Sequence, residues 1–308
     1  MSRDPFPNEP DRVQGSDLGS PFECNEAGAR EISGTIIRDS RGTSDPKGSF
    51  DARRARESDD SARAHYLRDR TYLLRESEFA TLVEIGKFRV IGVTDLAEFG
   101  YGGDTARMNR DVRGMERQGL IARRSLESAN RGTEQVLVLT RKAHRLIFKS
   151  GRLPEGQAIY HGLVRPREAR HDAQLYRLYQ RQSAKIESAG GRPLRVVLDY
   201  ELMRKLHRDL ASMGEAGRTR EVRERLAEKH GLALINDKVQ IPDLRLEYET
   251  ADYEPRRVNL ELATRNYRAG ALTEKAKAGF FIYAPREDVS KLRRILDEPE
   301  LIARILSL

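Results

Sequence analysis

The chain has 308 residues and a formal net charge of +8 with a pI of about 9.6, so a polyanionic partner is expected, with nucleic acid ahead of an acidic membrane surface. No apolar run approaches the ~20 residues of a membrane span, and the N-terminus has no apolar signal core. The single cysteine, Cys24, excludes an internal disulfide framework and a cysteine-rich zinc site, so we expect a soluble, cytoplasmic protein with two folded domains.

Residues 1–62 are predicted to form a disordered tail. They are rich in Pro, Gly, Ser, Asp and Arg and have almost no periodic apolar positions, so burial cannot offset the entropy lost on folding. Arginine alternates with acidic residues in 51–63, which fits a solvated linker better than a binding arm. Cys24 lies in this tail without a nearby histidine and is a poor catalytic candidate.

Residues 63–150 are predicted to form a winged helix-turn-helix domain. A first helix is indicated by apolar residues at helical spacing: Phe79, Leu82, Val83 and Ile85. Thr94 is a natural N-cap for a short second helix at 95–99. A permissive turn follows, marked by Gly100, Gly102 and Gly103, and Asp104 or Thr105 can begin the next helix. The order is helix, tight turn, helix.

The third predicted helix, 104–118, has the pattern of a recognition helix. Met108, Val112 and Met115 fall on one face at i, i+4 and i+7. The opposite face carries Arg110, Arg113 and Arg117, with Arg107 and Asn109 at its margins. Guanidinium groups turned outward can bind guanine edges or phosphates in a major groove. An ordinary amphipathic helix with a solvated charged face has the same pattern, so the neighbouring elements carry the prediction.

The neighbouring segment is predicted to form the wing. Two strands, 120–124 and 135–139, flank a polar tip at 127–133, where Arg131 is placed to reach a minor groove or phosphate. Thr140 caps a closing basic helix that contains Lys142. We expect groove contacts from Arg107, Asn109, Arg110 and Arg113, and phosphate contacts from Arg117, Arg131 and Lys142.

A Gly- and Pro-containing linker is predicted at 151–170, and an α+β domain at 171–308. His161 and His171 flank the end of the linker without a third ligand or a carboxylate cluster, so solvated or capping roles are expected. The predicted helices are at 171–186, 202–213, 218–230, 272–279 and 289–296, with strands at 194–198, 239–248, 257–263 and 280–283 and a closing turn at 301–306. This element order is also that of the restriction-endonuclease-like fold. The helix at 218–230 is highly charged, and a salt-bridged exposed helix is favoured over a basic arm near DNA.

Two acids in this domain, Asp243 after Pro242 and Glu261, are predicted on adjacent strands. Such carboxylates can converge on one Mg²⁺ ion, which could activate water for phosphodiester hydrolysis. The pattern resembles the PD-(D/E)xK nuclease signature, but Ala263 stands where the lysine belongs. Lys275 or Lys277 on the following helix could substitute for it. A degenerate module used for docking or dimerisation is the alternative, since two acids on a hairpin are common by accident.

Both halves together resemble the replication-relaxation family of bacterial plasmids and other mobile elements. The resemblance covers residues 76–308 and rests on the element order and on a few residues: Leu139 to Lys142, His171–Asp172, Pro242–Asp243, Glu261 to Ala263 and Lys275. It implies DNA binding in a mobile-element setting and does not establish nuclease activity. The expected partner is double-stranded DNA, with no cofactor needed for binding and Mg²⁺ needed for cleavage.

Other readings of the sequence stay open. The chain is either a DNA reader, a Mg²⁺-dependent nuclease, or a winged-helix transcriptional regulator or antitoxin that binds a protein partner through residues 171–308. Homodimerisation would fit paired DNA half-sites. The pattern does not decide whether the protein is an enzyme.

Overall fold

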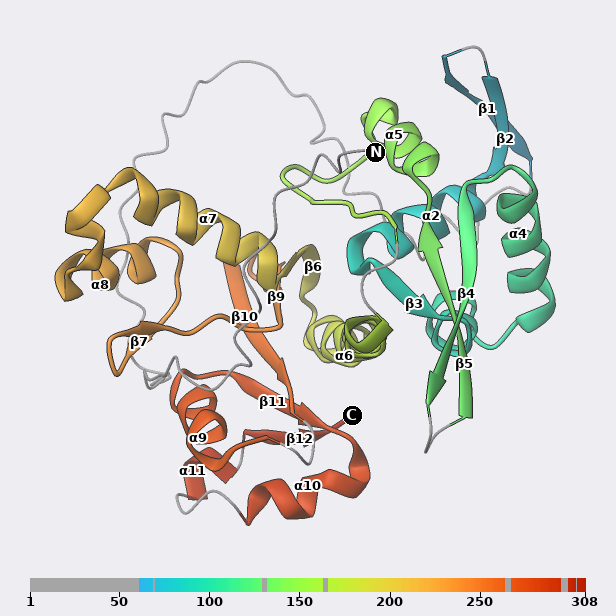
Figure 1. Cartoon of the computed structure of the whole chain (residues 1–308). Helices are drawn as coiled ribbons and strands as arrows, with labels where there is room; N and C mark the ends of the chain where they lie inside the picture. Colours follow the sequence, from blue (N-terminus) through green and yellow to red (C-terminus); the bar gives the residue numbers. More distant parts are fainter. Residues whose placement is uncertain are drawn as a thin grey trace, which may run out of the picture.

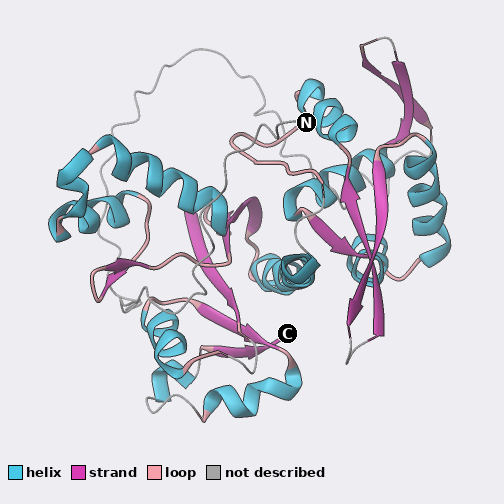
Figure 2. Cartoon of the chain, in the orientation of Figure 1, coloured by secondary structure: helices cyan, strands magenta, loops and turns pink. Residues whose placement is uncertain are grey.

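A computed structural model describes residues 61–308, with the exception of 69, 129–131, 163–165, 264–266, 295–298 and 303. The predicted tail up to residue 60, with Cys24, and the predicted wing-tip contact Arg131 lie outside the described residues. Helices and strands mix along the chain, so the fold is α+β (Figure 2). Within the described ranges, no helix combines the length and the apolar content required to cross a bilayer.

The first group of elements surrounds a small antiparallel sheet. In chain order they are β1 (Ala62–Leu67), β2 (Arg70–Arg75), α2 (Glu76–Phe88), β3 (Val90–Gly92), α3 (Val93–Asp95), the π-helix η1 (Leu96–Gly100), α4 (Thr105–Arg117), β4 (Ile121–Ser128), β5 (Gly132–Leu139) and α5 (Arg141–Ser150). Strands β1 and β2 form a hairpin, and β3, β5 and β4 form the sheet in that spatial order. Helices α2, α4 and α5 pack against this sheet, and the shared core includes the buried Phe79 of α2, Leu137 of β5 and Ile147 of α5.

Several details of this region differ from the sequence-based expectation. The hairpin β1–β2 is not predicted because apolar residues lie on both of its faces, and strand β3 is not predicted because it has only three residues. Thr94 lies inside the short helix α3, whose N-cap is Gly92. The π-helical turn that follows is wider than a regular α-helix and leads into Gly102 and Gly103, which both have positive φ. Asp104 is the N-cap of α4, as predicted, and accepts a hydrogen bond from the Arg107 amide at 2.9 Å.

The second group of elements builds a five-stranded mixed sheet. In chain order they are α6 (Pro166–Ser188), β6 (Arg192–Leu198), α7 (Asp199–Ser212), the 3₁₀ helix η2 (Gly214–Arg218), α8 (Arg220–Lys229), β7 (Leu234–Ile235), β8 (Lys238–Val239), β9 (Leu244–Glu249), β10 (Pro255–Leu262), α9 (Ala269–Lys277), β11 (Phe281–Ala284), α10 (Arg286–Arg293), α11 (Pro299–Ile302) and β12 (Ile305–Ser307). The spatial order is β12-β11-β10-β9-β6. Strand β9 pairs antiparallel with both β6 and β10, whereas β11 pairs parallel with both β10 and β12. The parallel step from β10 to β11 is made through α9.

The C-terminal segment corrects one expectation. The predicted turn at 301–306 is instead the end of α11 followed by β12, which pairs with β11 from Ile282↔Ile305 onward. Ile305 is fully buried. A three-residue strand has too few positions to show a period in the sequence, so its burial beside β11 decides its conformation.

Helix α6 lies between the two groups and contacts both (Figure 1). The predicted helix from 171 begins at Pro166, where the fixed φ of proline suits a first helical turn. Tyr176 packs edge-on against Phe88 of α2 with ring centroids 5.2 Å apart. Toward the other group, Lys185 donates to the Tyr283 hydroxyl of β11 at 2.9 Å. One continuous apolar core therefore runs from α2 and α4 through α6 to β9 and β10.

Candidate functional site

Helix α4 has one buried and one exposed face, as predicted. Met108, Val112 and Met115 are at most 2% exposed and pack in the main core. Arg110, Arg113 and Arg117 are exposed, while Arg107 and Asn109 are partly buried at the margins. The three exposed arginines line one open surface hollow together with Ala106 and Glu116. The helix therefore presents a grouped set of guanidinium donors on the side opposite its apolar anchor.

The three arginines differ in how the protein itself uses them. Arg110 Nε lies 3.2 Å from Asp111 Oδ1, although the Arg110 side chain is still 47% exposed. Arg117 Nε donates to the Arg113 carbonyl at 3.4 Å. Among the described residues, no carboxylate lies within ion-pairing distance of Arg113 or Arg117. Arg113 and Arg117 are therefore the guanidinium groups of this helix that are most available to an external anion.

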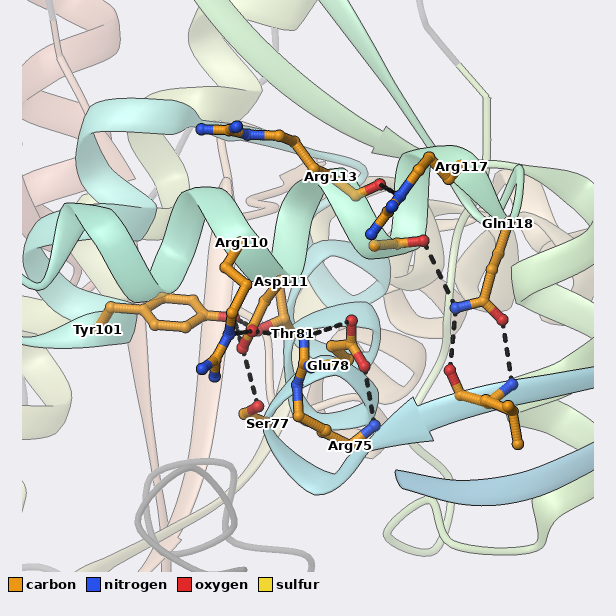
Figure 3. A network of polar contacts seen from close by, with 12 residues as sticks. Arg75, Ser77, Glu78, Thr81, Tyr101, Arg110, Asp111, Arg113, Arg117 and Gln118 are labelled. Atoms are coloured by element: carbon orange, nitrogen blue, oxygen red, sulfur yellow. Dashed lines mark hydrogen bonds and ion pairs between the residues drawn. The ribbon is translucent and has the colours of Figure 1, made fainter. Parts of the chain in front are cut away.

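A buried carboxylate fixes α4 to the elements beneath it (Figure 3). Asp111 is completely buried and accepts from Arg75 at 2.9 Å, Ser77 at 2.8 Å and Tyr101 at 3.2 Å. These partners come from the end of β2, the start of α2 and the turn before α4. Charge-assisted hydrogen bonds of this kind hold the orientation of the helix about its axis. Figure 3 shows Arg113 pointing away from this cluster.

Arg75 continues the same network toward α2. Its backbone amide and its guanidinium both donate to the Glu78 carboxylate, at 2.8 Å and 3.0 Å. Burial raises the pKa of Glu78, and the contacts with Arg75 oppose that shift. The first turn of α2 is therefore linked to α4 through one arginine that serves two acids.

The role of Asp111 could have been recognised from its position in the sequence. Position 111 is i+3 from Met108 and i−4 from Met115, so it lies within the buried stripe. An acid at such a position must have partners, because an unpaired buried charge is costly. Those partners, Arg75 and Ser77, lie 36 and 34 residues away, and nothing in the sequence identifies them.

The remaining predicted DNA contacts are spread around α4. Lys142, on the first turn of α5, is exposed, and its amine lies near Gly119 at the end of the turn that follows α4. Lys142 therefore borders the C-terminal end of the arginine face. Arg131 lies outside the described residues, although the strands of the predicted wing, β4 and β5, pair as far as Ser128↔Gly132.

The second candidate site joins the predicted acids at the beginning of β9 and the end of β10. Asp243 directly precedes β9, and its amide donates to Glu261 Oε2 of β10 at 3.2 Å. Lys275 of α9 lies 2.8 Å from Glu261 Oε1 and also donates to the Ile241 carbonyl at 2.7 Å. Asp243, Glu261 and Lys275 therefore meet in one place, and Lys275 is the lysine that reaches the acids.

Two further side chains complete this acid cluster, which we define as His171, Asp243, Glu261, Tyr267 and Lys275. His171 Nε2, from α6, lies 3.3 Å from Asp243 Oδ2. The Tyr267 hydroxyl donates to Glu261 Oε1 at 2.5 Å. The sequence does not predict either residue in this site. His171 lies 72 residues before Asp243, and its expected role is solvated or capping.

The electrostatics of the cluster follow from burial and from close pairs. Burial and the Asp243 charge raise the pKa of Glu261 to about 6, against the opposing effect of Lys275. Burial also acts to raise the pKa of Asp243, but His171 outweighs it, so that pKa lies below its ordinary value. For His171, burial lowers the pKa while Asp243 and Asp172 raise it more strongly, so the pKa lies well above 6.5. The His171–Asp243 pair is therefore ionised near neutral pH.

The carboxylate oxygens of the cluster are already engaged by the protein, which bears on a Mg²⁺ site. Glu261 accepts from Lys275, Tyr267 and the Asp243 amide, and Asp243 Oδ2 accepts from the Leu262 amide at 2.8 Å. Mg²⁺ requires oxygen ligands in octahedral geometry. In the described part of the chain, no three His, Cys, Asp or Glu side chains are grouped so as to hold a metal ion. As arranged, the acids fit the Lys275 ammonium group and do not fit Mg²⁺.

Comparison with known proteins adds no assignment. The sequence matches no protein-family model and no curated protein.

Proposed function

We propose that this protein binds double-stranded DNA through a winged helix-turn-helix formed by α2, α3, α4 and the sheet β3-β5-β4. The observation that carries the proposal is the pair Arg113 and Arg117. Both are exposed and have no acidic partner in the part of the chain that the structure describes, and the opposite face of their helix is buried in the core. Arg113 and Arg117 are four residues apart, so two like charges adjoin on one helix face, an arrangement that is mildly unfavourable until an anion binds there. Glu116, the acid next to Arg117 in the sequence, pairs with Arg123 at 3.2 Å instead, and Asp111, the acid nearest to Arg113, is buried and bound to Arg75.

The anchoring of α4 favours recognition rather than mere charge display. A reading helix must hold its side chains in a fixed register against base edges or phosphates. Asp111 and the apolar stripe fix both the rotation and the depth of α4 in this protein. Arg110, which already contacts Asp111, would keep part of that contact while facing the groove, so we assign the larger share of DNA contact to Arg113 and Arg117.

DNA binding is tested by fluorescence anisotropy with duplexes selected from a random library. We expect Arg113→Ala and Arg117→Ala each to weaken binding by about 1–3 kcal/mol. The matched control is Arg220→Ala on α8, which removes the same charge from an arginine paired with Glu224 and should change affinity little. Equal effects of Arg113→Ala and Arg220→Ala would remove α4 from the interface.

We further propose that the second group of elements has a restriction-endonuclease-like fold. Its helix α6, the antiparallel strands β6, β9 and β10, the helix α9 and the parallel strand β11 follow the order of that fold. Elements α7 to β8 are then an insertion between the first two strands. This comparison concerns topology and does not by itself imply cleavage.

A second candidate function is Mg²⁺-dependent DNA cleavage. The meeting of Asp243, Glu261 and Lys275 favours it, whereas the engagement of both carboxylates by protein donors opposes it. A plasmid-nicking assay with and without Mg²⁺ separates the two functions. Cleavage that is lost in both Asp243→Ala and Glu261→Ala would establish nuclease activity. DNA binding without cleavage would support DNA binding as the function.

The biological setting stays a prediction from the order of elements. Predictions from the sequence include membership of the replication-relaxation family, a plasmid or mobile-element origin, homodimerisation, and a role as a regulator or antitoxin with a protein partner. A partner that co-purifies through residues 171–308 would favour the last of these.

A further inference from the structure

The hairpin β1–β2 is held firmly next to helix α4. Gln118, the C-cap of α4, donates to the Leu73 carbonyl at 2.9 Å and accepts from the Leu73 amide at 3.1 Å. Arg75, the last residue of β2, binds Asp111 of α4 at 2.9 Å. The hairpin is thus tied to α4 near both the middle and the end of the helix, and it packs beside α5 as well.

One face of the hairpin is built into the core, and the other is exposed. The His65 ring stacks on Phe79 at 5.2 Å, and Tyr72 and Leu74 are buried. On the opposite face Tyr66 is 63% exposed and Leu73 is 58% exposed. Figure 1 shows the hairpin projecting beyond α4 and α5. It is therefore a rigidly based ribbon whose outer half extends from the proposed reading surface.

The charge of the hairpin is positive. Its strands, Ala62–Leu67 and Arg70–Arg75, contain no acidic residue, and Asp69 between them lies outside the described residues. The exposed basic groups are Arg63, Arg68 and Arg70. Arg63 lies 3.9 Å from Glu76 at the base of the hairpin, whereas Arg68 and Arg70 lie at its tip. Arg68 and Arg70 flank Asp69 in the sequence, and neither makes an ion pair with any of the residues that the structure describes.

We propose that the hairpin β1–β2 is a second DNA contact, which places Arg68 and Arg70 on the phosphate backbone beside the groove entered by α4. The proposal rests on the proposed DNA-binding function. Two-stranded ribbons fit the dimensions of DNA grooves and flanks, and guanidinium groups bind phosphates with little regard for sequence. Because Gln118 and Arg75 fix the hairpin to α4, both contacts fall on one duplex in a set register.

The role of the contact is to lengthen the footprint without reading bases. Phosphate contacts position a protein, whereas base contacts specify the sequence. We therefore expect the hairpin to raise affinity for every duplex by a similar factor. Arg113 of α4, which is predicted to contact the groove, would keep the discrimination between duplexes.

The test compares the double variant Arg68→Ala/Arg70→Ala with the wild type, using anisotropy over a salt series. We expect the slope of log affinity against log salt to become less steep by about two, with the ratio between selected and random duplexes unchanged. Arg68→Lys/Arg70→Lys should restore the slope, because the charges are kept. The control is Arg220→Ala/Arg225→Ala on α8, which removes two exposed charges elsewhere. Circular dichroism melting confirms that each variant is folded.

The outcomes separate this proposal from the one on which it rests. If Arg113→Ala weakens binding and the hairpin variant matches the α8 control, the hairpin proposal is overturned while α4 remains the reader. If the hairpin variant reduces the salt slope and Arg113→Ala matches its own control, the hairpin binds DNA and the role of α4 fails. A hairpin variant that changes the ratio between duplexes would contradict a backbone contact.

Discussion

The exposed face of α4 and the acid cluster use charge in opposite ways. On α4, Arg113 and Arg117 point outward without an acidic partner among the described residues. In the acid cluster, Glu261 and Lys275 are 3% and 16% exposed and are bound to each other. The charges of the acid cluster are neutralised inside the protein and contribute to its architecture, whereas the grouped arginines of α4 stay available to an external anion. The same residue types thus give different functional information according to where their counterions lie.

The largest expected effect comes from breaking the buried pair. Glu261→Ala leaves Lys275 without its acid and removes an acceptor from Tyr267, so we expect the free energy of unfolding to fall by about 3–5 kcal/mol. Urea denaturation measures it. Arg113→Ala is the matched surface substitution and should change the free energy of unfolding by no more than about 0.5 kcal/mol. Similar losses in the two variants would contradict the contrast between the sites.

Replacing both partners of the pair should cost less than removing one. Glu261→Leu combined with Lys275→Met leaves no unpaired ammonium group, and we expect a loss under about 2 kcal/mol in the same denaturation experiment. The comparison with Glu261→Ala isolates the cost of the stranded charge. A double variant that is less stable than Glu261→Ala would show that Glu261 acts mainly through its other partners.

A glycine on α4 tests the anchoring of the proposed reading helix. A Cβ at Gly114 would fall on the Glu78 carboxylate, which is buried and bound to Arg75. We expect Gly114→Ala to destabilise the protein by about 1–3 kcal/mol despite the better helix propensity of alanine. Gly270→Ala on α9, where a Cβ meets open space, is the control and should stabilise by up to about 1 kcal/mol. Equal stabilisation by Gly114→Ala and Gly270→Ala would show that α4 does not pack tightly against Glu78.

The smallest expected effect is a change in pH dependence. The folded pKa of His171 lies above its unfolded value near 6.5, so its stabilisation is complete below pH ~6.5 and is lost as pH rises through the folded pKa. His171→Gln should therefore lose stability relative to wild type at pH ~6 and approach it at high pH. Asp243 has a pKa below its ordinary value, so its contribution to the free energy of unfolding is lost only as pH falls through that lowered pKa. A constant difference between the two proteins across this range would exclude the ionised pair.

The sequence predicts the elements with long apolar periods and not the short ones. Helices α2, α4 and α6 carry several buried residues at helical spacing, and their existence is confirmed. Strands β3 and β12 have three residues each, and their conformation is decided by the strands beside them. The hairpin β1–β2 was missed because its outer face carries Tyr66 and Leu73, so apolar residues lie on both faces and the alternation is lost.

The candidate sites show a similar division. The exposed arginines of α4 follow from local spacing, because a helix fixes which residues share a face. The convergence of Asp243 and Glu261 follows from two adjacent strands. His171, Tyr267 and the partners of Asp111 come from distant segments, and their positions depend on tertiary packing that no local pattern encodes.

We expect helix α6 to couple the unfolding of the two halves of this protein, because it packs against both. It supplies Tyr176 to the side of α2 and Lys185 to the side of β11, so neither half retains its full core without it. Calorimetry of the intact chain should then show a single transition, because small cores that share a helix melt together. Occupation of the arginine face by DNA would in turn raise the melting temperature of the distant sheet.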